Sequence, residues 1–315
     1  MRSFFLFRKR RKVTTPISTP EIPLESTNKQ RSWYAIKSET QKAVNQDAYQ
    51  DFHDDKSGTV VLALADGIGS SKHAEEGSRF VVDKAIELLK EEVQNGRNID
   101  YLGIFNRIQL ELTAMIEQKH EGQPDVINAY DFGTTLIVGV DAPDIFTLAY
   151  IGNGCAYYLQ GDVTCFPNSN HFPWAINDLL TPHSLPNKTN GKDELCKYFC
   201  YHPTNVDQTV PTVVSISKNH HAGEIFVLAT DGFDSCDKHD VFFYQNKVLF
   251  TNSCWNMSLL CKDIKAYLKT TQKIDDEGLT EVLTDYLDSQ QNDDRMNDDT
   301  TIGIIVSTRV APKLP

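Results

Sequence analysis

The sequence lacks a long apolar run and an excess of positive charge, and each absence excludes a class of protein. The N-terminal apolar stretch covers only residues 4–7, which is too short to cross a bilayer, and its basic residues follow it instead of preceding it as in a signal peptide. We therefore expect no transmembrane segment. With 43 acidic and 31 basic residues, the net charge is −12, which argues against a nucleic acid as the main partner.

The chain also lacks paired cysteine motifs. Its seven cysteines are an odd number and include no Cys-x-x-Cys, a usage typical of a reducing compartment, so we expect a cytoplasmic protein. Cys196, Cys200 and His202 come nearest to a zinc cluster, but their spacing is irregular and the sequence suggests no fourth ligand. No cysteine begins a Cys-x5-Arg loop, which disfavours catalysis by a cysteine nucleophile.

Two regions differ in composition from the rest of the chain. Residues 1–30 combine a basic run at positions 8–12 with a stretch rich in Pro, Ser and Thr, which predicts a disordered tail. The favoured interpretation is a solvated tail, and the alternative is peripheral contact of its apolar tip and basic run with an anionic membrane surface. Residues 31–310 are predicted to form one domain, in which residues 165–208, with five prolines, form an irregular insertion.

Two apolar runs of this chain end on the same dipeptide, Asp66-Gly67 and Asp231-Gly232. Each run predicts a buried strand with a carboxylate at its end. A single Asp-Gly after a strand is a common turn and carries little information. The repetition matters because other acidic phrases stand at the start of a strand instead of at its end.

Asp47 opens the strand that precedes the first of these dipeptides, and Asp298-Asp299 opens the last strand of the chain. In an antiparallel hairpin the start of one strand lies opposite the end of its neighbour, which makes Asp47 a neighbour of Asp66. Antiparallel pairing of the last strand with the strand that ends at Asp231 likewise brings Asp298 or Asp299 beside Asp231. The sequence therefore predicts a cluster of carboxylates at the ends of sheets.

Such a cluster needs cations, because crowded carboxylates repel one another at neutral pH. Oxygen ligands without His or Cys favour Mg2+ or Mn2+ over zinc. Two such ions, about 3.5–4 Å apart, can hold a bridging hydroxide and stabilise phosphoryl transfer. An acidic calcium-binding structural domain is a weaker interpretation, because the acids are dispersed along the chain and do not form one ligand loop.

The remaining elements predict a layered fold. Two helices are expected after Asp66-Gly67, the first capped by Ser70 or Ser71, and two more near residues 256–268 and 278–287. Helix pairs between hairpin-linked strands, without regular alternation, are typical of an α+β sandwich of antiparallel sheets covered by helices. The further strands are expected at residues 132–140, 145–151, 156–159, 210–217, 224–230 and 301–307.

These phrases, in this order, resemble the metal-dependent serine/threonine protein phosphatases, the PPM family of protein phosphatase 2C type, in their bacterial-like form. The resemblance covers roughly residues 33–308 and rests on six phrases in register. They are Asn45-Gln46-Asp47-Ala48, Ala65-Asp66-Gly67-Ile68-Gly69, Phe132-Gly133-Thr134-Thr135, Ile151-Gly152-Asn153-Gly154-Cys155-Ala156-Tyr157, Ala229-Thr230-Asp231-Gly232-Phe233 and Asp298-Asp299-Thr300-Thr301.

The resemblance implies a four-layer α-β-β-α sandwich, with two central antiparallel sheets flanked by helices and two Mn2+ or Mg2+ ions at one end. It implies that Asp66 bridges both ions and that the backbone carbonyl of Gly67 serves one of them. Asp231 and Asp298 would hold the other. Asp47 would orient bound water.

Several positions depart from the family pattern. Gln46 stands where the family has a Glu that reaches its ion through water, so this position keeps an oxygen acceptor but loses a charge. Lys42 matches the phosphate-binding Arg, and a Lys pairs with phosphate as a point charge without the bidentate fork, which predicts weaker or less directional substrate binding. A solvated surface Lys is the alternative interpretation. Asn153 and Ser235 replace two acids that help to bind a third, weaker metal in many relatives.

Ile68 stands where some relatives carry a His that acts as an acid. Protonation of the leaving group would then come from water or from another group such as His73, which is otherwise a helix-surface residue.

The sequence thus predicts a protein serine/threonine phosphatase, a phosphoric monoester hydrolase whose substrate is a phosphorylated protein. Metal-activated water would attack the phosphorus of a phosphoserine or phosphothreonine ester in line. The alternative is a pseudophosphatase, in which the same fold serves as a binding or sensing module. Small-molecule phosphate esters are further candidate substrates.

Overall fold

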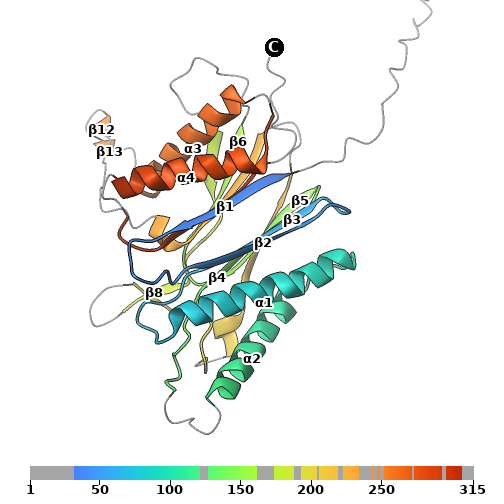
Figure 1. Ribbon diagram of the computed structural model, residues 1–315, viewed down its shortest axis with the longest axis vertical. Coiled ribbons are helices and arrows are strands. Elements are labelled where there is room, and N and C mark those ends of the chain that lie inside the picture. The colour runs from blue at the N-terminus through green and yellow to red at the C-terminus, as the bar shows by residue number, and fades with distance from the viewer. Residues whose placement is uncertain are drawn as a thin grey trace, which may run out of the picture.

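The computed structural model describes residues 32–120, 127–161, 174–187, 193–203, 206–218, 223–233, 243–244, 247–248, 252–271, 273–292 and 296–306. In these ranges the chain forms two five-stranded sheets, two two-stranded sheets and the helices α1 to α4 (Figure 1). The predicted tail at residues 1–30, Ser235 and parts of the predicted insertion lie outside the described residues. No helix in the described part of the chain combines the length and the apolar character needed to cross a membrane.

Both large sheets are antiparallel throughout. The first sheet has the order β1-β14-β11-β6-β7. Its strands are β1 (Trp33–Glu39), β14 (Thr300–Val306), β11 (Gly223–Ala229), β6 (Cys155–Gly161) and β7 (Trp174–Asp178). The second sheet has the order β10-β5-β4-β3-β2. Its strands are β10 (Thr212–Ser217), β5 (Ile145–Ile151), β4 (Leu136–Asp141), β3 (Thr59–Ala65) and β2 (Ala48–Asp54).

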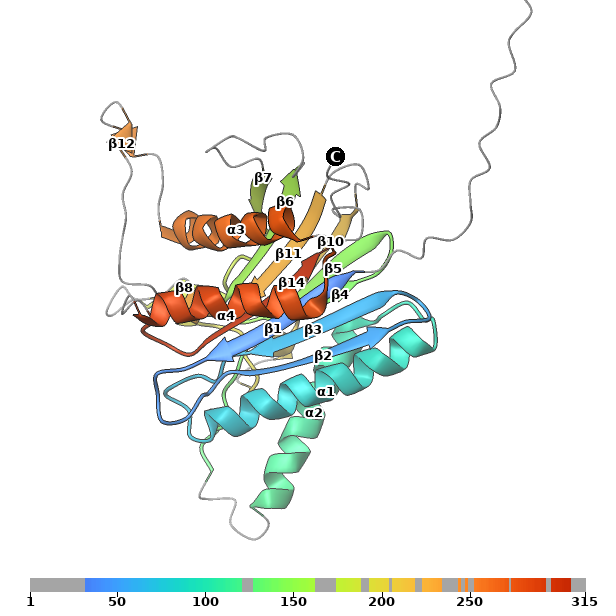
Figure 2. The same cartoon turned by 45° about the horizontal axis from the view of Figure 1, so that its top comes forward.

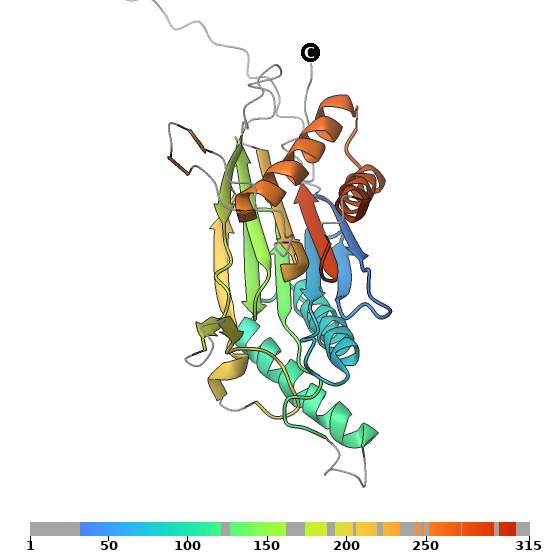
Figure 3. The same ribbon diagram turned by 90° about the vertical axis from the view of Figure 1, so that its left-hand side faces the viewer.

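Two helix pairs cover the outer faces of the sheets. The helices α1 (Ala74–Gln94) and α2 (Tyr101–Lys119) share an apolar core with the second sheet. The helices α3 (Asn252–Thr270) and α4 (Asp276–Asn292) share another with the first sheet. Figures 2 and 3 show the pairs on opposite sides of the strands. The predicted four-layer sandwich is confirmed.

A third apolar core joins the two sheets. Phe146 on β5 and Phe226 on β11 stack with their ring centroids 3.9 Å apart, and Tyr158 on β6 stacks on Phe226 at 5.0 Å. Leu62 on β3 and Leu228 on β11 are fully buried in the same layer. Strands buried on both faces explain why β3 and β14 are almost continuously apolar in sequence.

The strand registers place the acidic residues at strand ends. In the β2–β3 hairpin Ala48 pairs with Ala65, so that Asp47 and Asp66 are the next residues beyond the paired ends, as predicted. In the first sheet Ala229 of β11 pairs with Ile302 of β14. This register sets the segment that follows β11 beside the segment that precedes β14, which was also predicted from antiparallel pairing.

Some local predictions were wrong. The helix α1 is not capped by Ser70 or Ser71: it begins at Ala74 after His73, which has a left-handed backbone (φ 64°) and no capping side-chain bond. The hydroxyl of Ser71 donates instead to the carbonyl of Tyr130 at 2.9 Å. Strand β4 begins at Leu136, four residues later than predicted.

Several short strands were missed. The edge strands β1 and β7 did not appear among the predicted elements, and the region predicted to be irregular contains β7 and the pair β8 (Ser184–Pro186) and β9 (Asp193–Leu195). A second small pair is β12 (Phe243–Tyr244) with β13 (Lys247–Val248). Two 3-10 helices, η2 (Val206–Thr209) and η3 (Asp231–Phe233), complete the described elements.

Candidate metal centre

Five aspartates gather at one end of the sandwich, each at the end of a strand. Asp66 follows β3, Asp231 follows β11 at the start of η3, Asp47 precedes β2, and Asp298 and Asp299 precede β14. The two sheets each contribute to this group, because β2 and β3 belong to one sheet and β11 and β14 to the other. The predicted cluster of carboxylates is therefore present in the structure.

Asp47 is buried between the two sheets. Its Oδ2 accepts hydrogen bonds from the hydroxyls of Thr230 at 2.8 Å and Thr301 at 2.7 Å, and both threonines belong to the opposite sheet or its flank. Its Oδ1 is buried and receives no donor among the described residues. The Asp66 carboxyl lies within hydrogen-bond reach of Asp47, a contact that requires one shared proton or a cation. Asp47 thus has one fixed oxygen and one that is available to a ligand.

The backbone of Asp66 is held on both sides by the segment that leads into β4. Its carbonyl accepts from the Thr134 hydroxyl and from the Thr135 amide, both at 2.9 Å. Its amide donates to the Thr135 hydroxyl at 3.0 Å. These bonds fix the end of β3, so the position of the Asp66 carboxylate does not depend on a mobile loop.

Gly67 lies where the backbone comes too close for any side chain. A Cβ at this position would be 2.7 Å from the carbonyl oxygen of Ala74 and 2.9 Å from that of Gln46. Its amide donates to the same Gln46 carbonyl at 3.1 Å, and Ser78 donates to that oxygen at 2.6 Å. The requirement for glycine after Asp66 is therefore steric, and it brings the Gln46 segment against the first turn of α1.

Asp231 is held by the turn between β5 and β6. The Asn153 side-chain amide donates to Asp231 Oδ2 at 2.6 Å, from a turn whose flanking Gly152 and Gly154 have φ angles of 104° and 121° that favour glycine. After Asp231, a Cβ on Gly232 would clash with the carbonyl of Asp299. The residue that replaces the expected acid thus acts as a hydrogen-bond donor to a neighbouring carboxylate.

Lys42 contacts the aspartates before β14. Its ammonium pairs with Asp298 and lies 3.4 Å from Asp299 Oδ2. Burial opposes the charged form of Lys42, but Asp298 and Asp299 together raise its pKa. Asp299 is buried and also accepts from the Gln46 amide at 2.9 Å and from the Thr40 hydroxyl. No other Lys, Arg or His in the described part of the chain forms an ion pair with these five aspartates.

The electrostatics of this group favour a cation. Burial, followed by the charges of Asp231, Asp47 and Asp298, raises the pKa of Asp66 well above its ordinary value. Burial raises the pKa of Asp47 to about 7 despite its two threonine bonds. Burial and the charge of Asp298 raise the pKa of Asp231 against the bond from Asn153. Each shift has the sign expected of carboxylates that lack a counter-ion, and bound cations would reverse it.

The donor set fits hard divalent ions, since it consists of carboxylate, amide and carbonyl oxygens. A second group of possible metal ligands lies outside this cluster. His73, Glu75 and Glu76 each place one ligand atom within 4.8 Å of the other two. In that group Lys119 already pairs with Glu76, and His73 Nδ1 lies 3.1 Å from Glu76. His73 also stacks on Phe132, a contact that joins the start of α1 to the segment that precedes β4.

Sequence reasoning missed the partners that hold the aspartates. Thr40, Thr230 and Thr301 bind carboxylates of the cluster through their hydroxyls, and Asp299 connects Lys42 to the Gln46 backbone. Thr230 and Thr301 stand inside the quoted acidic phrases, so their position was the one available signal. Threonine is common in strands, however, and only the register shows which hydroxyls reach Asp47.

Comparison with known proteins agrees with this architecture. A family model described as protein phosphatase 2C matches residues 37–288. The catalytic domain of the serine/threonine protein phosphatase PstP, in complex with two manganese ions, is similar with a TM-score of 0.54 and 18% identity over 88% of this chain and 99% of that chain.

Two further solved structures have the same fold. The PstP/Ppp phosphatase of Mycobacterium tuberculosis aligns with a TM-score of 0.54 and 16% identity, over 87% of this chain and 98% of that one. Stp1 from Staphylococcus aureus aligns with a TM-score of 0.53 and 17% identity, over 88% and 94%. No curated protein matches the sequence. Because the family model spans most of the chain, and the sandwich with its aspartate cluster is in place, the chain belongs to the protein phosphatase 2C family.

Proposed function

We propose that this protein hydrolyses phosphoserine and phosphothreonine esters of proteins with the help of two Mn2+ or Mg2+ ions. The observation that carries this proposal is the group of five aspartates at the strand ends, which has one ammonium as its contact cation among the described residues. Family membership supports the phosphatase reaction. The manganese-bound PstP structure, of the same fold, supports the choice of ion.

The residues proposed to hold the ions are those of the centre itself. Asp66 would bridge both, the Gly67 carbonyl would serve one ion together with Gln46, and Asp231 and Asp298 would serve the other. The charges of Asp231 and Asp298 both raise the pKa of Asp66, which supports their serving neighbouring ions. When bound, the ions supply a water of lowered pKa and neutralise phosphate oxygens.

Other residues of the chain would position and charge the substrate site. Asp47, fixed by Thr230 and Thr301, has its second oxygen available to orient water for attack. Lys42 would leave its ion pair with Asp298, which is partly exposed, to bind the phosphate as a point charge. Asp298, no longer paired with Lys42, would then be available to hold one of the ions.

The alternative function is a pseudophosphatase that binds or senses without hydrolysis. Gln46 and Asn153 favour it, because each removes a carboxylate from the family pattern. The structure places Asn153 as a donor to Asp231, however, so this substitution stabilises a retained ligand instead of leaving a gap. We also propose a cytoplasmic location, which the absence of a disulfide among Cys155, Cys196, Cys200 and Cys261 supports.

The decisive experiment is hydrolysis of a phosphothreonine peptide with added Mn2+, by the wild type and by Asp66→Asn. We expect turnover that requires Mn2+ and that falls by at least a factor of about 100 in Asp66→Asn, because the variant loses the bridging charge. Asp55→Asn is the matched control, since Asp55 is fully exposed in the β2–β3 turn. Equal, metal-independent background in all three proteins would support the pseudophosphatase.

A further inference from the structure

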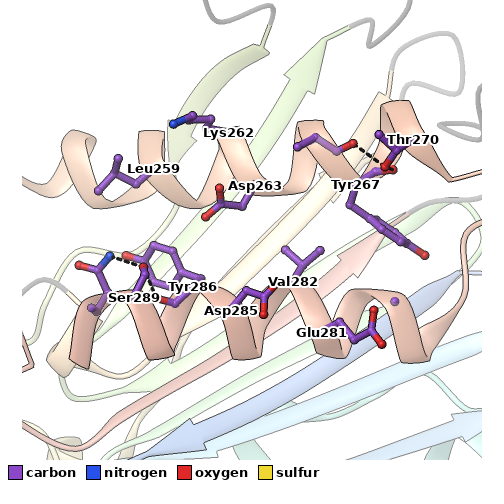
Figure 4. A pocket seen from close by; sticks show the side chains of 13 residues that line it. Leu259, Lys262, Asp263, Tyr267, Thr270, Glu281, Val282, Asp285, Tyr286 and Ser289 are labelled. Carbon is purple, nitrogen blue, oxygen red and sulfur yellow. Dashed lines mark hydrogen bonds between the residues drawn. The ribbon is translucent and has the colours of Figure 1, made fainter. Parts of the chain in front are cut away.

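A groove separates the helices α3 and α4 on the outer face of the first sheet, and none of the residues that line it belongs to the proposed metal centre. Its volume is about 570 Å3, and Figure 4 shows the side chains that line it. Its apolar lining comes chiefly from Leu259 on α3 and from Val282 and the ring of Tyr286 on α4. A groove of this size with an apolar lining can accept one or two large apolar side chains.

The walls of this groove are acidic. Asp263 on α3 points toward α4, where Asp285 and Glu281 line the opposite wall (Figure 4). Burial raises the pKa of Asp263, the charge of Lys262 lowers it and that of Asp285 raises it again. Lys262 is the one basic residue of the lining, so the three acids exceed the basic residues by two. The groove therefore carries a net negative charge beside apolar surface.

Gln290 gives an independent sign of a missing partner. Its side chain is 4% exposed, it lines the groove, and its Oε1 has no hydrogen-bond donor among the described residues. A buried amide oxygen without a partner destabilises the fold. An N–H donor within reach of this oxygen would satisfy it.

The near end of the groove lies close to the point at which the N-terminal segment enters the fold. Asp276, the first residue of α4, accepts a hydrogen bond from the Tyr34 amide at 2.9 Å, and Gly278 of the lining is two residues further on. At this end Tyr267 packs where a Cβ on Gly278 would clash with its ring. Residues 1–31 are therefore joined to the domain next to the groove.

The N-terminal segment has the composition that complements this groove. Residues 4–7 are Phe-Phe-Leu-Phe, and residues 8–12 are Arg-Lys-Arg-Arg-Lys. Without the six basic residues of positions 1–12, the remainder of the chain has a net charge of −18 instead of −12. We propose that residues 4–12 of this chain dock in the α3–α4 groove, with the apolar tip on its apolar lining and the basic run against Asp263, Glu281 and Asp285.

The segment that connects residues 4–12 to the domain can span the length of the groove, and it is short enough to keep these residues near the groove. Nineteen residues lie between Lys12 and Ser32, and this segment spans at most roughly 70 Å when extended. The groove from Gly278 to Gln290 follows α4 for about 18 Å at 1.5 Å per residue. A tether of this length gives an effective concentration on the order of millimolar, so a weak contact between residues 4–12 and the groove is sufficient.

Zero-length carbodiimide cross-linking of the full chain tests the proposal, because it joins an amine to a carboxylate only in contact. We expect Lys9 or Lys12 to be linked to Asp263, Glu281 or Asp285, and the yield to fall several-fold in 0.5 M salt. In Asp263→Asn/Asp285→Asn the remaining link to Glu281 should fall several-fold. The control Asp55→Asn/Asp288→Asn removes two exposed acids that do not line the groove, and its yield should be unchanged.

Trypsin supplies a second readout that does not depend on cross-linking. Cleavage after residues 8–12 should be several-fold faster in Asp263→Asn/Asp285→Asn than in the wild type or the control variant. Equal cleavage rates in all three, or links from Lys9 and Lys12 spread over acids elsewhere, would overturn the proposal. Links between isotopically light and heavy chains would instead identify a second copy as the occupant. Protection only by phosphatidylserine vesicles, equal in all variants, would assign the segment to a membrane surface.

Discussion

Among the single residues of the metal centre, the carboxylate oxygens differ in whether they already have a partner in the protein. Asp47 uses one oxygen for Thr230 and Thr301, whereas Asp298 shares its carboxylate with Lys42. The neighbourhood of Asp47 and Asp66 was predictable from sequence, because a short hairpin turn fixes the register locally. The partner of Lys42 was not, since 256 residues separate Lys42 from Asp298 and only the assembled first sheet brings them together.

We predict that Lys42→Ala raises the KM for a phosphothreonine peptide several-fold, because the site loses its point charge for phosphate. Lys42→Arg should leave the KM at the wild-type value or lower it, since a guanidinium forms two parallel bonds to phosphate. Steady-state kinetics at saturating Mn2+ measures both. An unchanged KM in Lys42→Ala would discard the phosphate role and leave the ion pair with Asp298 as the function of this residue.

At the scale of elements, the turn between β5 and β6 is held from outside by the segment that precedes β8. His183 Nδ1 accepts from the Gly152 amide at 3.2 Å, Nε2 lies 2.8 Å from the Thr212 hydroxyl, and the ring stacks on Tyr150. Burial and the charge of Lys197 lower the pKa of His183 to about 4. Protonation of Nδ1 would remove the acceptor for Gly152 and loosen the turn that carries Asn153.

We predict that this histidine destabilises the fold in mild acid. Its folded pKa of about 4 lies below the ordinary value of 6.5, so the unfolded chain binds the proton more readily, and stability falls as the pH drops from about 6.5 toward 4. In urea unfolding, the wild type should lose about 1 kcal/mol more between pH 7 and pH 5 than His183→Gln, after allowance for partial exposure. Parallel pH profiles of the two proteins would refute this role.

Elements were predicted well where the signal is local and poorly where it is tertiary. The β2–β3 hairpin, both helix pairs and the last strand follow from apolar spacing and turn residues. The predicted cap of α1 was wrong because the Ser71 hydroxyl donates to the carbonyl of Tyr130 in a distant loop. Strand β7 was missed because a proline-containing stretch separates it from its partner β6. The edge strand β1 was missed because only one of its seven residues, Ala35, is buried, which leaves no clear apolar pattern.

At the scale of the whole molecule, the centre is a source of repulsion until cations bind. Five aspartates at one end of the sandwich meet one ammonium, and three of them have raised pKa values. The four-layer fold itself was predictable from the order of helix pairs and hairpins. Its separate inner and outer cores were not, because a strand buried on both faces has no alternation that assigns its sides.

We predict that the wild type gains thermal stability from Mn2+ whereas Asp66→Asn does not. Saturation at about 100 times the Kd contributes about 2.7 kcal/mol, or several degrees in Tm. In EDTA we expect Asp66→Asn to melt about 2–8 °C above the wild type. Loss of one repelling charge should raise its free energy of unfolding by about 1–2 kcal/mol. Asp55→Asn should follow the wild type in both buffers; a variant that melts below the wild type in EDTA would contradict the repulsion.

The contact of Asp47 with Thr230 and Thr301 has a mechanical consequence. One carboxyl from the second sheet is anchored on hydroxyls at the ends of two adjacent strands of the first. Any sliding of one sheet over the other would therefore move this carboxyl away from Asp66 or break its anchors. The position of the Asp47 carboxyl relative to Asp66 therefore depends on how the two sheets are aligned. Substitutions in the apolar layer between the sheets can alter turnover without contacting an aspartate.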